Sequence, residues 1–305
     1  MAKNKNIIRH KMRESLSDRI LVGVIYVVMT FLAVITLYPM LYVLFASFSD
    51  PIQFAIKKGL LFKPAGFSII GYKSVMTMRT FWRGYGMTMF YLVAGTLINM
   101  TLTILGAYTM SRKFMLRKPI MLLMIFTMYF GGGMIPTYLT IKNMGMTGTI
   151  WSILLPGCIS VYNLIILRTG FEGIPESLVE SAEMDGAGDL TILWKIILPL
   201  SKASLATITL FYAVGRWGEW YNAMVYLESN RSLYPLQMIL RETLVEGQNL
   251  DVAVDVMGVS TADSILVKEI SKYSMVIIST VPVLIVYPFV QKYFVKGVMI
   301  GAVKG

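Results

Sequence analysis

Residues 20–47 read ILVGVIYVVMTFLAVITLYPMLYVLFAS, and none of these side chains carries a charge. A helix needs about 20 apolar residues to cross the roughly 30 Å of hydrocarbon in a bilayer. The stretch is also about twice as long as the apolar core of a cleaved signal peptide. It therefore predicts a transmembrane helix that stays in the protein, preceded by a basic tail at residues 1–19.

Five further long apolar stretches follow, at residues 84–110, 119–138, 149–167, 203–226 and 273–293. The whole chain is 56% hydrophobic and only 15% charged, whereas soluble domains carry about 25% charged residues. The stretches are too long for barrel strands and do not alternate between apolar and polar residues. We therefore expect an all-α membrane protein with six transmembrane helices in a domain spanning residues 20–293.

The formal net charge is +11, and the basic residues cluster at the ends of the apolar stretches. This placement is typical of membrane-flanking charge rather than of a nucleic-acid surface. A cytoplasmic N-terminus gives the inside segments the higher density of Lys and Arg, so both tails, 1–19 and 294–305, are predicted to be cytoplasmic. The single cysteine, Cys158, and the single histidine, His10, exclude a disulfide framework within the chain and make a zinc site implausible.

The inside loop at residues 169–202 reads TGFEGIPESLVESAEMDGAGDLTILWKIILPLSK. Pro175 suits the first turn of a helix, and Gly186 and Gly188 permit a tight turn after that helix. Asp189 is expected to cap a second short helix, which Pro199 would end. The loop also concentrates acids that are scarce in the other inside loops: Glu172, Glu176, Glu180, Glu183, Asp185 and Asp189. Two short helices joined by a glycine turn suit a peg that inserts into a partner, although an inert connector is the alternative.

This loop resembles the EAA loop of the permease subunits of ABC importers. Glu180-Ser181-Ala182 matches the motif that names it, with serine in place of one alanine. Gly186 follows the glutamate at six positions, and Ile196-Ile197-Leu198-Pro199 begins at sixteen. In that family the loop docks in a cleft of the ATP-hydrolysing subunit, and Glu180 would pair with a basic residue there. The coupling residues that the resemblance implies are Glu180, Ser181, Ala182, Asp185, Gly186, Ile196, Leu198 and Pro199.

The whole chain looks like the maltose-type carbohydrate permeases of the branch that handles oligosaccharides or polysaccharide fragments. The segments that carry this resemblance are 130–138, 217–222 and 296–305. It implies the type I ABC importer permease fold in a bacterial plasma membrane. It also implies a second homologous permease, two ATPase subunits and an extracellular substrate-binding protein. ATP and Mg would act at the ATPase, with no cofactor bound by this chain.

Residues 216–222, RWGEWYN, place two charges in the fifth stretch. Charge within a membrane is costly, and it marks either a transport path or an internal ion pair. A substrate path would use Arg216, Trp217, Glu219, Trp220, Tyr221 and Asn222, whereas a structural pair with an aromatic belt is the other interpretation. The outside loop at 227–272 is expected either to contact the binding protein or to cover the neighbouring spans.

Two other classes of function remain open. No G-x-x-x-x-G-K-[ST] phosphate loop occurs, so this chain cannot hydrolyse ATP by that route, and energy must come from another subunit. As a transport subunit, the chain is not expected to be an enzyme. An ion-coupled carrier would use Arg216 and Glu219 as its coupling pair. A glycan-cleaving enzyme would need paired carboxylates, for which the outside loop offers Glu242, Glu246, Asp251 and Asp255. Uptake of a non-sugar solute by an ABC importer is a further alternative.

Overall fold

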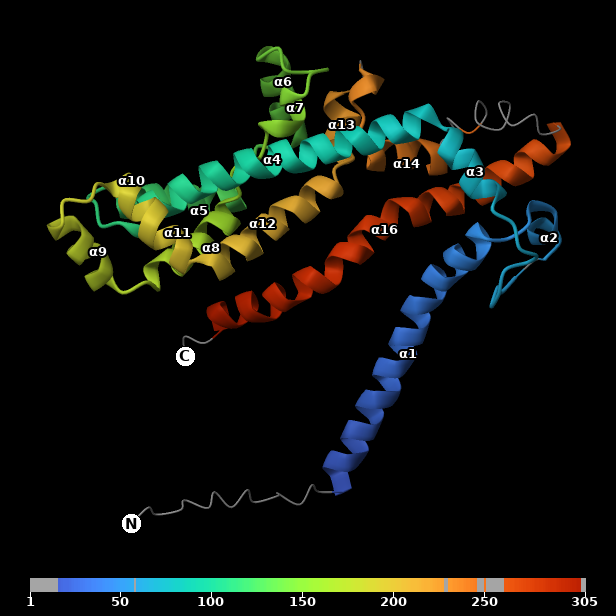
Figure 1. The fold of residues 1–305 in the computed structure, drawn as a ribbon, viewed down its shortest axis with the longest axis horizontal. Helices are drawn as coiled ribbons and strands as arrows, with labels where there is room; N and C mark the ends of the chain where they lie inside the picture. Colours follow the sequence, from blue (N-terminus) through green and yellow to red (C-terminus); the bar gives the residue numbers. More distant parts are fainter. Residues whose placement is uncertain (1–15, 58, 228–229, 246–249, 251–260, 303–305) are drawn as a thin grey trace.

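The structure, a computed structural model, describes residues 16–302 apart from 58, 228–229, 246–249 and 251–260. Every regular element in that part of the chain is helical (Figure 1). The helices before the acidic loop are α1 (Leu16–Ser47), α2 (Pro51–Ile56), α3 (Ile70–Thr77), α4 (Arg79–Ser111), α5 (Arg117–Tyr129), α6 (Met134–Asn143), α7 (Trp151–Leu154) and α8 (Val161–Glu172). The others are α9 (Glu176–Met184), α10 (Asp189–Ile192), the π-helical turn η1 (Leu193–Ile197), α11 (Leu198–Leu200), α12 (Lys202–Trp217), α13 (Tyr221–Tyr226), the 3-10 turn η2 (Arg231–Leu233), α14 (Leu236–Val245) and α16 (Thr261–Ala302).

Three of the described helices are long and apolar enough to cross a membrane without interruption. They are α1, α4 and the part of α16 from Asp263 to Pro288. Two bent pairs of helices also qualify if each pair counts as one span: α5 with α6, and the segment Asp189–Leu200 with α12. The expectation of an all-helical protein with long apolar helices is therefore confirmed, but the described residues do not form six uninterrupted spans.

The stretch 149–167 is the clearest departure from six continuous helices. It forms the short helix α7, then a non-helical segment at residues 155–160, and then the start of α8. Pro156 lacks a backbone N–H, and Gly157 adopts a φ of 67°, so the helix stops there. Ser160 caps α8 by accepting a hydrogen bond from the backbone N–H of Asn163. With 12 residues, α8 is about 18 Å long, which is too short to cross hydrocarbon alone.

The boundaries of three other stretches also need correction. The stretch 119–138 bends by 111° between α5 and α6, where Gly133 has a φ of 85°. The stretch 203–226 is interrupted after Trp217 and resumes only as the short helix α13. The last helix, α16, begins at Thr261, twelve residues before the apolar stretch that predicted it. Hydropathy marks the apolar part of each helix, and polar turns extend or interrupt it.

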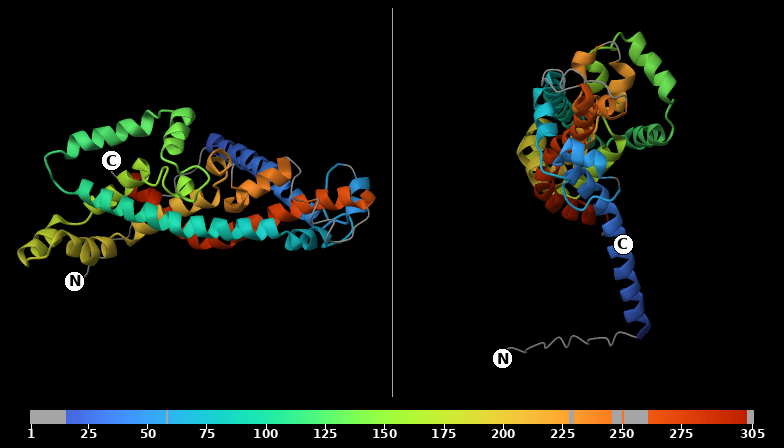
Figure 2. Two further views of the ribbon diagram at one scale, coloured as in Figure 1. Left: turned by 90° about the horizontal axis from the view of Figure 1, so that it is seen from above. Right: turned by 90° about the vertical axis from the view of Figure 1, so that its right-hand side faces the viewer.

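A bundle of α4, α8, α12 and α16 forms the centre of the fold. Helix α4 packs against α8 and α12, while α16 packs against α12, α3 and α1 (Figure 1). Helices α5 and α6 stand to one side of this bundle in both views of Figure 2. The largest buried cluster joins α4, α8 and α12 to the acidic loop through residues such as Leu164, Leu167 and Ile208. The loop is therefore part of the core at one end of the bundle.

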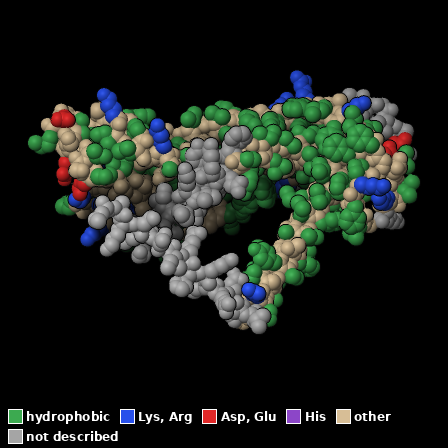
Figure 3. Space-filling model, turned by 60° about the horizontal axis from the view of Figure 1, so that its bottom comes forward, with side chains coloured by type: hydrophobic (Ala, Val, Ile, Leu, Met, Phe, Trp, Pro, Cys, Tyr) green, Lys and Arg blue, Asp and Glu red, His purple; other side chains and the backbone are tan. Residues whose placement is uncertain are grey.

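Helix α1 diverges from the rest of the molecule (Figure 1). All of its side chains from residue 17 to 37 are exposed, and they include Tyr26 at 70% and Phe31 at 62%. Only its last part is buried, where Ala46 meets Leu61 and Ala65 of the following loop. Hydrophobic side chains also cover much of the face in Figure 3. Such extensive apolar exposure requires lipid or another subunit as its cover.

The two ends of the bundle carry different elements. The C-terminal ends of α4 and α16 and the acidic loop with α9 lie at one end in Figure 1, on the left. Helices α2 and α3 lie at the opposite end, with the N-terminal ends of α4 and α16. This arrangement separates the acidic loop from the segment between α1 and α4 by the full length of the bundle.

Candidate coupling site

The acidic loop consists of α9, a glycine turn, and the segment from α10 to α11. Gly186 adopts a φ of 79°, the left-handed conformation that favours glycine. The N–H of Ala187 donates to the carbonyl of Ala182 at 2.9 Å, and the N–H of Gly186 donates to that of Glu183 at 3.0 Å. This pair of hydrogen bonds is the Schellman motif, which ends a helix with a defined reversal. Backbone hydrogen bonds therefore fix the conformation of this turn.

One face of the loop is anchored in the core. Val179, Ile192, Leu193 and Ile197 are buried against α4, α8 and α12. The inward face of α9 is therefore set by Val179 and the half-buried Ala182, whereas Leu178 is 46% exposed. The sequence pattern did not single out these buried residues, although their spacing along α9 and α10 is that of a buried helix face.

The opposite face of the loop is free. Met184, at the end of α9, is 89% exposed, and Leu190 and Trp194 are 66% and 69% exposed. A Cβ atom added at Gly186 would have no neighbour within 4 Å in this chain. These groups form a projecting tip that combines a bare glycine with large apolar side chains. Exposed apolar groups of this kind mark a surface that contacts another protein or the membrane.

Tyr108, near the C-terminal end of α4, connects that helix to the loop. Its hydroxyl lies 3.0 Å from the carboxylate of Asp189 and 3.1 Å from the backbone carbonyl of the same residue. The guanidinium of Arg112 donates to the Tyr108 hydroxyl at 3.1 Å and lies 4.6 Å from the centre of its ring. Asp189 was expected as the cap of the second helix, but Gly188 occupies that position and Asp189 lies in the first turn.

Pro175 and Pro199, which flank the loop, occupy helix positions that differ from the predicted ones. Pro175 precedes α9 as its N-cap and is not part of the first turn. Pro199 does not end the second helix, because α11 continues to Leu200 and the chain then bends by 86° into α12. A proline early in a helix is tolerated because the N–H it lacks is unpaired there. The short helix α11 therefore accommodates Pro199 near its start.

Basic residues after α4, at the start of α5 and in α8 pair with acids at the start of the loop. Lys113 and Glu176 form an exposed ion pair at 2.7 Å, and Arg168 and Arg117 both contact Glu172. The hydrogen bond from Lys113 lowers the pKa of Glu176, and the same bond raises the pKa of Lys113. The opposite charges of these segments were visible in the sequence, but their pairing was not foreseen.

A cleft of about 880 Å³ lies between these basic residues and the loop. Glu180 and Glu183 line it from α9, and Arg112 and Lys113 line it from the other side. Glu180 is exposed and forms no ion pair with a described residue. The remaining predicted coupling residues divide by burial: Ser181, Asp185 and Pro199 are exposed, whereas Ile196 and Leu198 are half-buried against the core.

Residues 216–222, the predicted substrate path, fall into two groups. Arg216 is only 6% exposed, and its guanidinium donates to the carbonyls of Ile153 and Leu154 at the end of α7 and to the side chain of Asn99 on α4. Glu219 lies 3.8 Å from it. A Cβ at Gly95 would lie 2.7 Å from Arg216 Nε, so this glycine makes room for the arginine. Arg216 thus ties the broken fourth stretch to the bundle.

The aromatic members of the same segment point elsewhere. Trp217 is half-buried and meets Tyr85 edge to face at 6.0 Å. Trp220 and Tyr221 are 40% and 44% exposed, and the guanidinium of Arg241 lies 5.6 Å from the Trp220 ring. Asn222 is partly exposed beside them. The accessible part of the predicted path is therefore Trp220 to Asn222, not the buried charge pair.

Of the four carboxylates considered for a glycan-cleaving enzyme, the structure describes one, Glu242. Glu242 is 5% exposed and lies 2.9 Å from Arg231, whose pKa it raises. Glu246, Asp251 and Asp255 lie outside the described residues, as do His10 and most of the N-terminal tail. Cys158 is partly buried. The described member of that set of four is thus held in an ion pair within the chain.

Similarity to known proteins establishes the family of this chain. The chain is 38% identical to the polygalacturonan/rhamnogalacturonan transport system permease YtcP of Bacillus subtilis, over 95% of this chain and 100% of that protein. It is also 38% identical to LplC of the same species, over 89% and 90% of the two chains. No family model matches the chain.

A solved structure agrees with this assignment. A chain of a bacterial ABC transporter involved in the import of the acidic polysaccharide alginate superimposes with a TM-score of 0.83. The two chains are 35% identical, and the match covers 92% of this chain and 98% of the other. The protein belongs to the carbohydrate ABC permease family. It is a non-catalytic, integral membrane component of a transport system in which ATP is hydrolysed by other subunits.

Proposed function

We propose that this chain forms one half of a transmembrane path for oligosaccharides and is driven through the loop 169–202. In this proposal the exposed tip around Met184 and Gly186 docks in a cleft of one ATPase subunit. Glu180, Ser181, Ala182 and Asp185 lie on the docked helix, and Ile196, Leu198 and Pro199 carry the loop back to α12. ATP and Mg act at the ATPase alone.

The observation that carries this proposal is that the loop has an exposed tip and a buried base. Its tip is exposed and has a fixed backbone turn, while its base is buried against three helices of the bundle. A push on such a tip moves α4 and α12 as well, because packed interiors transmit displacement and do not absorb it. A loop that was only a connector would need neither the buried base nor the bond between Tyr108 and Asp189.

The proposal includes an orientation in the membrane. The loop and the C-terminal ends of α4 and α16 share one end of the bundle, which we assign to the cytoplasm together with the tails 1–19 and 294–305. The opposite end, with α2, α3 and the loop 227–272, then faces the extracellular substrate-binding protein. The exposed face of α1 suits a second, homologous permease subunit, with lipid over the remainder.

The cargo is assigned as an oligosaccharide that carries uronic acid residues. Two similar transport proteins are named for polygalacturonan/rhamnogalacturonan and for the acidic polysaccharide alginate. Trp220, Tyr221 and Asn222 supply accessible rings and an amide for sugar rings and hydroxyl groups. Competition against uptake of a labelled oligogalacturonate tests this assignment. An uncharged oligosaccharide of equal length that competes equally well would contradict it.

Two glycine variants test the coupling role directly. Leucine at Gly186 must adopt a positive φ, at a cost of about 1–2 kcal/mol, and it also fills the bare tip. Alanine at Gly188 meets nothing within 4 Å at an ordinary φ of −74° and serves as the matched control. We expect Gly186→Leu to abolish ATP-driven uptake while Gly188→Ala retains it, with both proteins inserted equally. Wild-type uptake by Gly186→Leu would overturn the proposal.

A further inference from the structure

A guanidinium group and two aromatic rings meet where α13 and α14 come together. The Cζ atom of Arg241, on α14, lies 5.6 Å from the centre of the Trp220 ring, which is within the range of a cation–π contact. The rings of Trp220 and Tyr221 stand nearly at right angles, with their centres 5.8 Å apart. Both rings are exposed, and Arg241 is partly exposed beside them. A positive charge and two accessible rings therefore share one surface.

Helix α14, which carries Arg241, is fixed firmly to α4. The N–H of Leu236, the first residue of α14, donates to the Thr88 hydroxyl at 2.8 Å. A Cβ at Gly84 would collide with the side chain of Ile239, so this glycine lets the two helices approach closely. The backbone that positions the guanidinium is therefore rigid, and little conformational entropy is lost there when a ligand binds.

The two rings are positioned by other elements of the fold. Trp220 directly precedes α13, which is held in place by the buried residues Ala223 and Tyr226. The hydroxyl of Tyr221 lies 2.7 Å from the sulfur of Met134, at the start of α6. The surface is thus assembled from α6, α13 and α14, so its geometry is set by tertiary packing.

An arginine beside an aromatic ring is well suited to binding a carboxylate. The guanidinium is planar, and contact with a ring leaves the N–H groups along its edge able to donate hydrogen bonds. It has five N–H donors, so two of them can bind both oxygens of one carboxylate while others keep contacts within the protein. The neighbouring rings offer flat apolar faces against which a pyranose ring can pack. The arrangement matches a sugar unit that carries a carboxylate.

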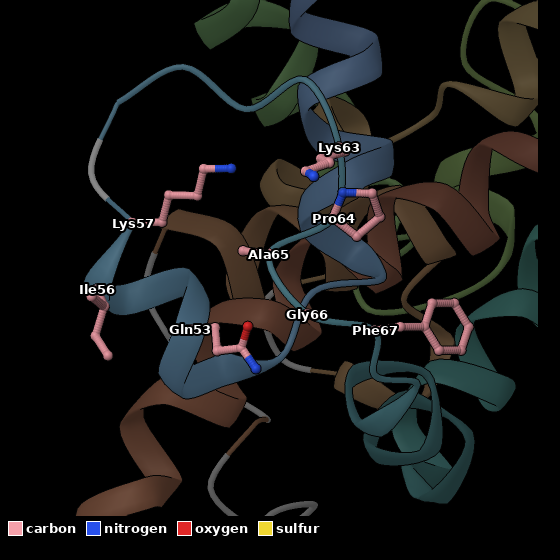
Figure 4. A pocket seen from close by; sticks show the side chains of 8 residues that line it. All are labelled: Gln53, Ile56, Lys57, Lys63, Pro64, Ala65, Gly66 and Phe67. Atoms are coloured by element: carbon pink, nitrogen blue, oxygen red, sulfur yellow. The ribbon is translucent and has the colours of Figure 1, made fainter.

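Positive charge alone does not single out Arg241 among the exposed cations of the chain. Lys57 and Lys63 line a pocket of about 700 Å³ between α2 and residues 63–67 (Figure 4). Phe67 supplies the aromatic ring of that pocket, and in Figure 4 this ring points away from both lysines. A lysine also binds as a point charge without a planar fork. The combination of a planar cation with exposed rings is found at Arg241.

We infer that Arg241 recognises the carboxylate of a uronic acid unit in the cargo, while the rings of Trp220 and Tyr221 pack against the pyranose ring of the same unit. The inference rests on the proposed function, which assigns a cargo with uronic acid residues and places this surface on the outer side of the membrane. It adds a residue that determines specificity. Without Arg241, the path handles neutral sugar units as before and acidic units poorly.

Two substrates of equal chain length separate the charge of the cargo from its shape. Oligogalacturonate carries the carboxylates, and its fully methyl-esterified form keeps the sugar rings without the charge. Uptake of each is measured in proteoliposomes that contain the complete transporter, with the cognate binding protein, whose own preference is the same in every arm. We expect Arg241→Gln to lower kcat/KM for the acid about tenfold, as for loss of a hydrogen bond to a charged group, and to leave the ester unchanged.

Two further variants complete the comparison. Arg241→Lys should restore part of the uptake of the acid, because it keeps the charge but not the planar fork. Arg79→Gln removes an exposed charge at the start of α4 and serves as the control, so it should change neither substrate. The melting temperature of each variant is measured alongside uptake, and we expect it to equal that of the wild type.

An equal loss for both substrates in Arg241→Gln, or no loss for either, would overturn the inference. If the wild type does not transport the ester, the acid alone decides. A loss in Arg241→Gln that Arg241→Lys partly restores at an unchanged melting temperature then supports the inference, and a loss that Arg241→Lys does not restore overturns it. If the wild type transports the acid and the ester equally well, the assignment of an acidic cargo fails, which is distinct from a failure at Arg241.

Discussion

The hydroxyl of Tyr108 and the carboxylate of Asp189 lie 3.0 Å apart, although the two residues are separated by 81 positions in the sequence. Tyr108 belongs to the long helix α4, and Asp189 begins the second half of the coupling loop. Arg112 donates to the same hydroxyl, so one group joins both sides of the cleft behind the loop. This contact gives the loop a direct mechanical connection to a transmembrane helix.

Removing that hydroxyl is expected to loosen the connection without disturbing the core. Tyr108→Phe keeps the ring but deletes the hydrogen bonds, at a cost of about 1–2 kcal/mol. We expect more ATP hydrolysed per sugar transported, because the loop moves with less effect on α4. The measurement is the ratio of ATPase activity to uptake in proteoliposomes. Tyr26→Phe, on the exposed face of α1, is the matched control, and an unchanged ratio in Tyr108→Phe would contradict this role.

The exposed pair of Lys113 and Glu176 should contribute little by itself. Exposed ion pairs are screened by water and salt. Exchanging the partners as Lys113→Glu/Glu176→Lys should preserve uptake, whereas Lys113→Glu alone brings like charges together. We expect the single variant to lower uptake at low salt and the exchange to restore it. Equal uptake by the wild type and the single variant would show that the pair has no role.

The same pair has a defined pH dependence. Lys113 lowers the folded-state pKa of Glu176 below its ordinary value of 4.5. The ion pair therefore makes its full contribution to stability at pH values above the unfolded-state pKa of Glu176. That contribution is lost as the pH falls through the folded-state pKa of Glu176. NMR titration of a selectively labelled Glu176 should give a midpoint below 4.5, and Lys113→Ala should raise it. If the midpoint of Glu176 does not change in Lys113→Ala, Lys113 does not set the pKa of Glu176.

Arg216 should be essential for folding more than for sugar recognition. Arg216→Met leaves the carbonyls of Ile153 and Leu154 without their donor and leaves Glu219 uncompensated. Breaking a buried pair in this way costs about 3–5 kcal/mol. We expect a large fall in the detergent melting temperature, partly restored by adding Glu219→Gln. If Arg216→Met melts like the wild type but loses uptake, Arg216 belongs to the substrate path instead.

Trp220 is expected to matter for sugar uptake more than for folding, in contrast to Arg216. Its ring is partly exposed, so Trp220→Ala removes an accessible surface with little loss of packing. We predict an unchanged melting temperature and a roughly two- to twelvefold loss of uptake, which corresponds to about 0.5–1.5 kcal/mol of ring contact. Trp217→Ala should instead lower the melting temperature, because Trp217 packs against Tyr85 inside the fold. Similar behaviour of both variants would contradict this division.

The sequence predicted those features that depend on neighbouring residues. The uncharged run at 20–47 and the glycine turn at 186 both lie where the local pattern placed them. The interruptions at Pro156 and Gly133 were harder to foresee, because apolar side chains continue on both sides and hydropathy alone does not register a bend. Tertiary packing decides whether a proline or glycine within such a run breaks the helix.

The partners of Asp189 and Arg216 could not be predicted, because they come from residues far away in the sequence. Aspartate is a residue type that often caps a helix, but the carboxylate of Asp189 instead accepts a hydrogen bond from the Tyr108 hydroxyl. Arg216 and Glu219, for which the sequence left an internal ion pair and a substrate path open, lie 3.8 Å apart, with Glu219 just beyond the end of α12. Their burial against α7 could not be inferred, because it requires the break in the fourth stretch. Local spacing thus identified the segments, and the fold determined which atoms meet.

Chemical crosslinking from the tip of the loop tests the central claim most directly. With Cys158 replaced by serine, the variant Met184→Cys places a single thiol at a position that is 89% exposed, and Phe67→Cys places one at the opposite end of the bundle. A thiol-anchored photocrosslinker at 184 should give a covalent adduct with the ATPase subunit, and the same reagent at 67 should give none. No adduct from position 184 in a transport-competent complex, or an equal adduct from position 67, would contradict the account.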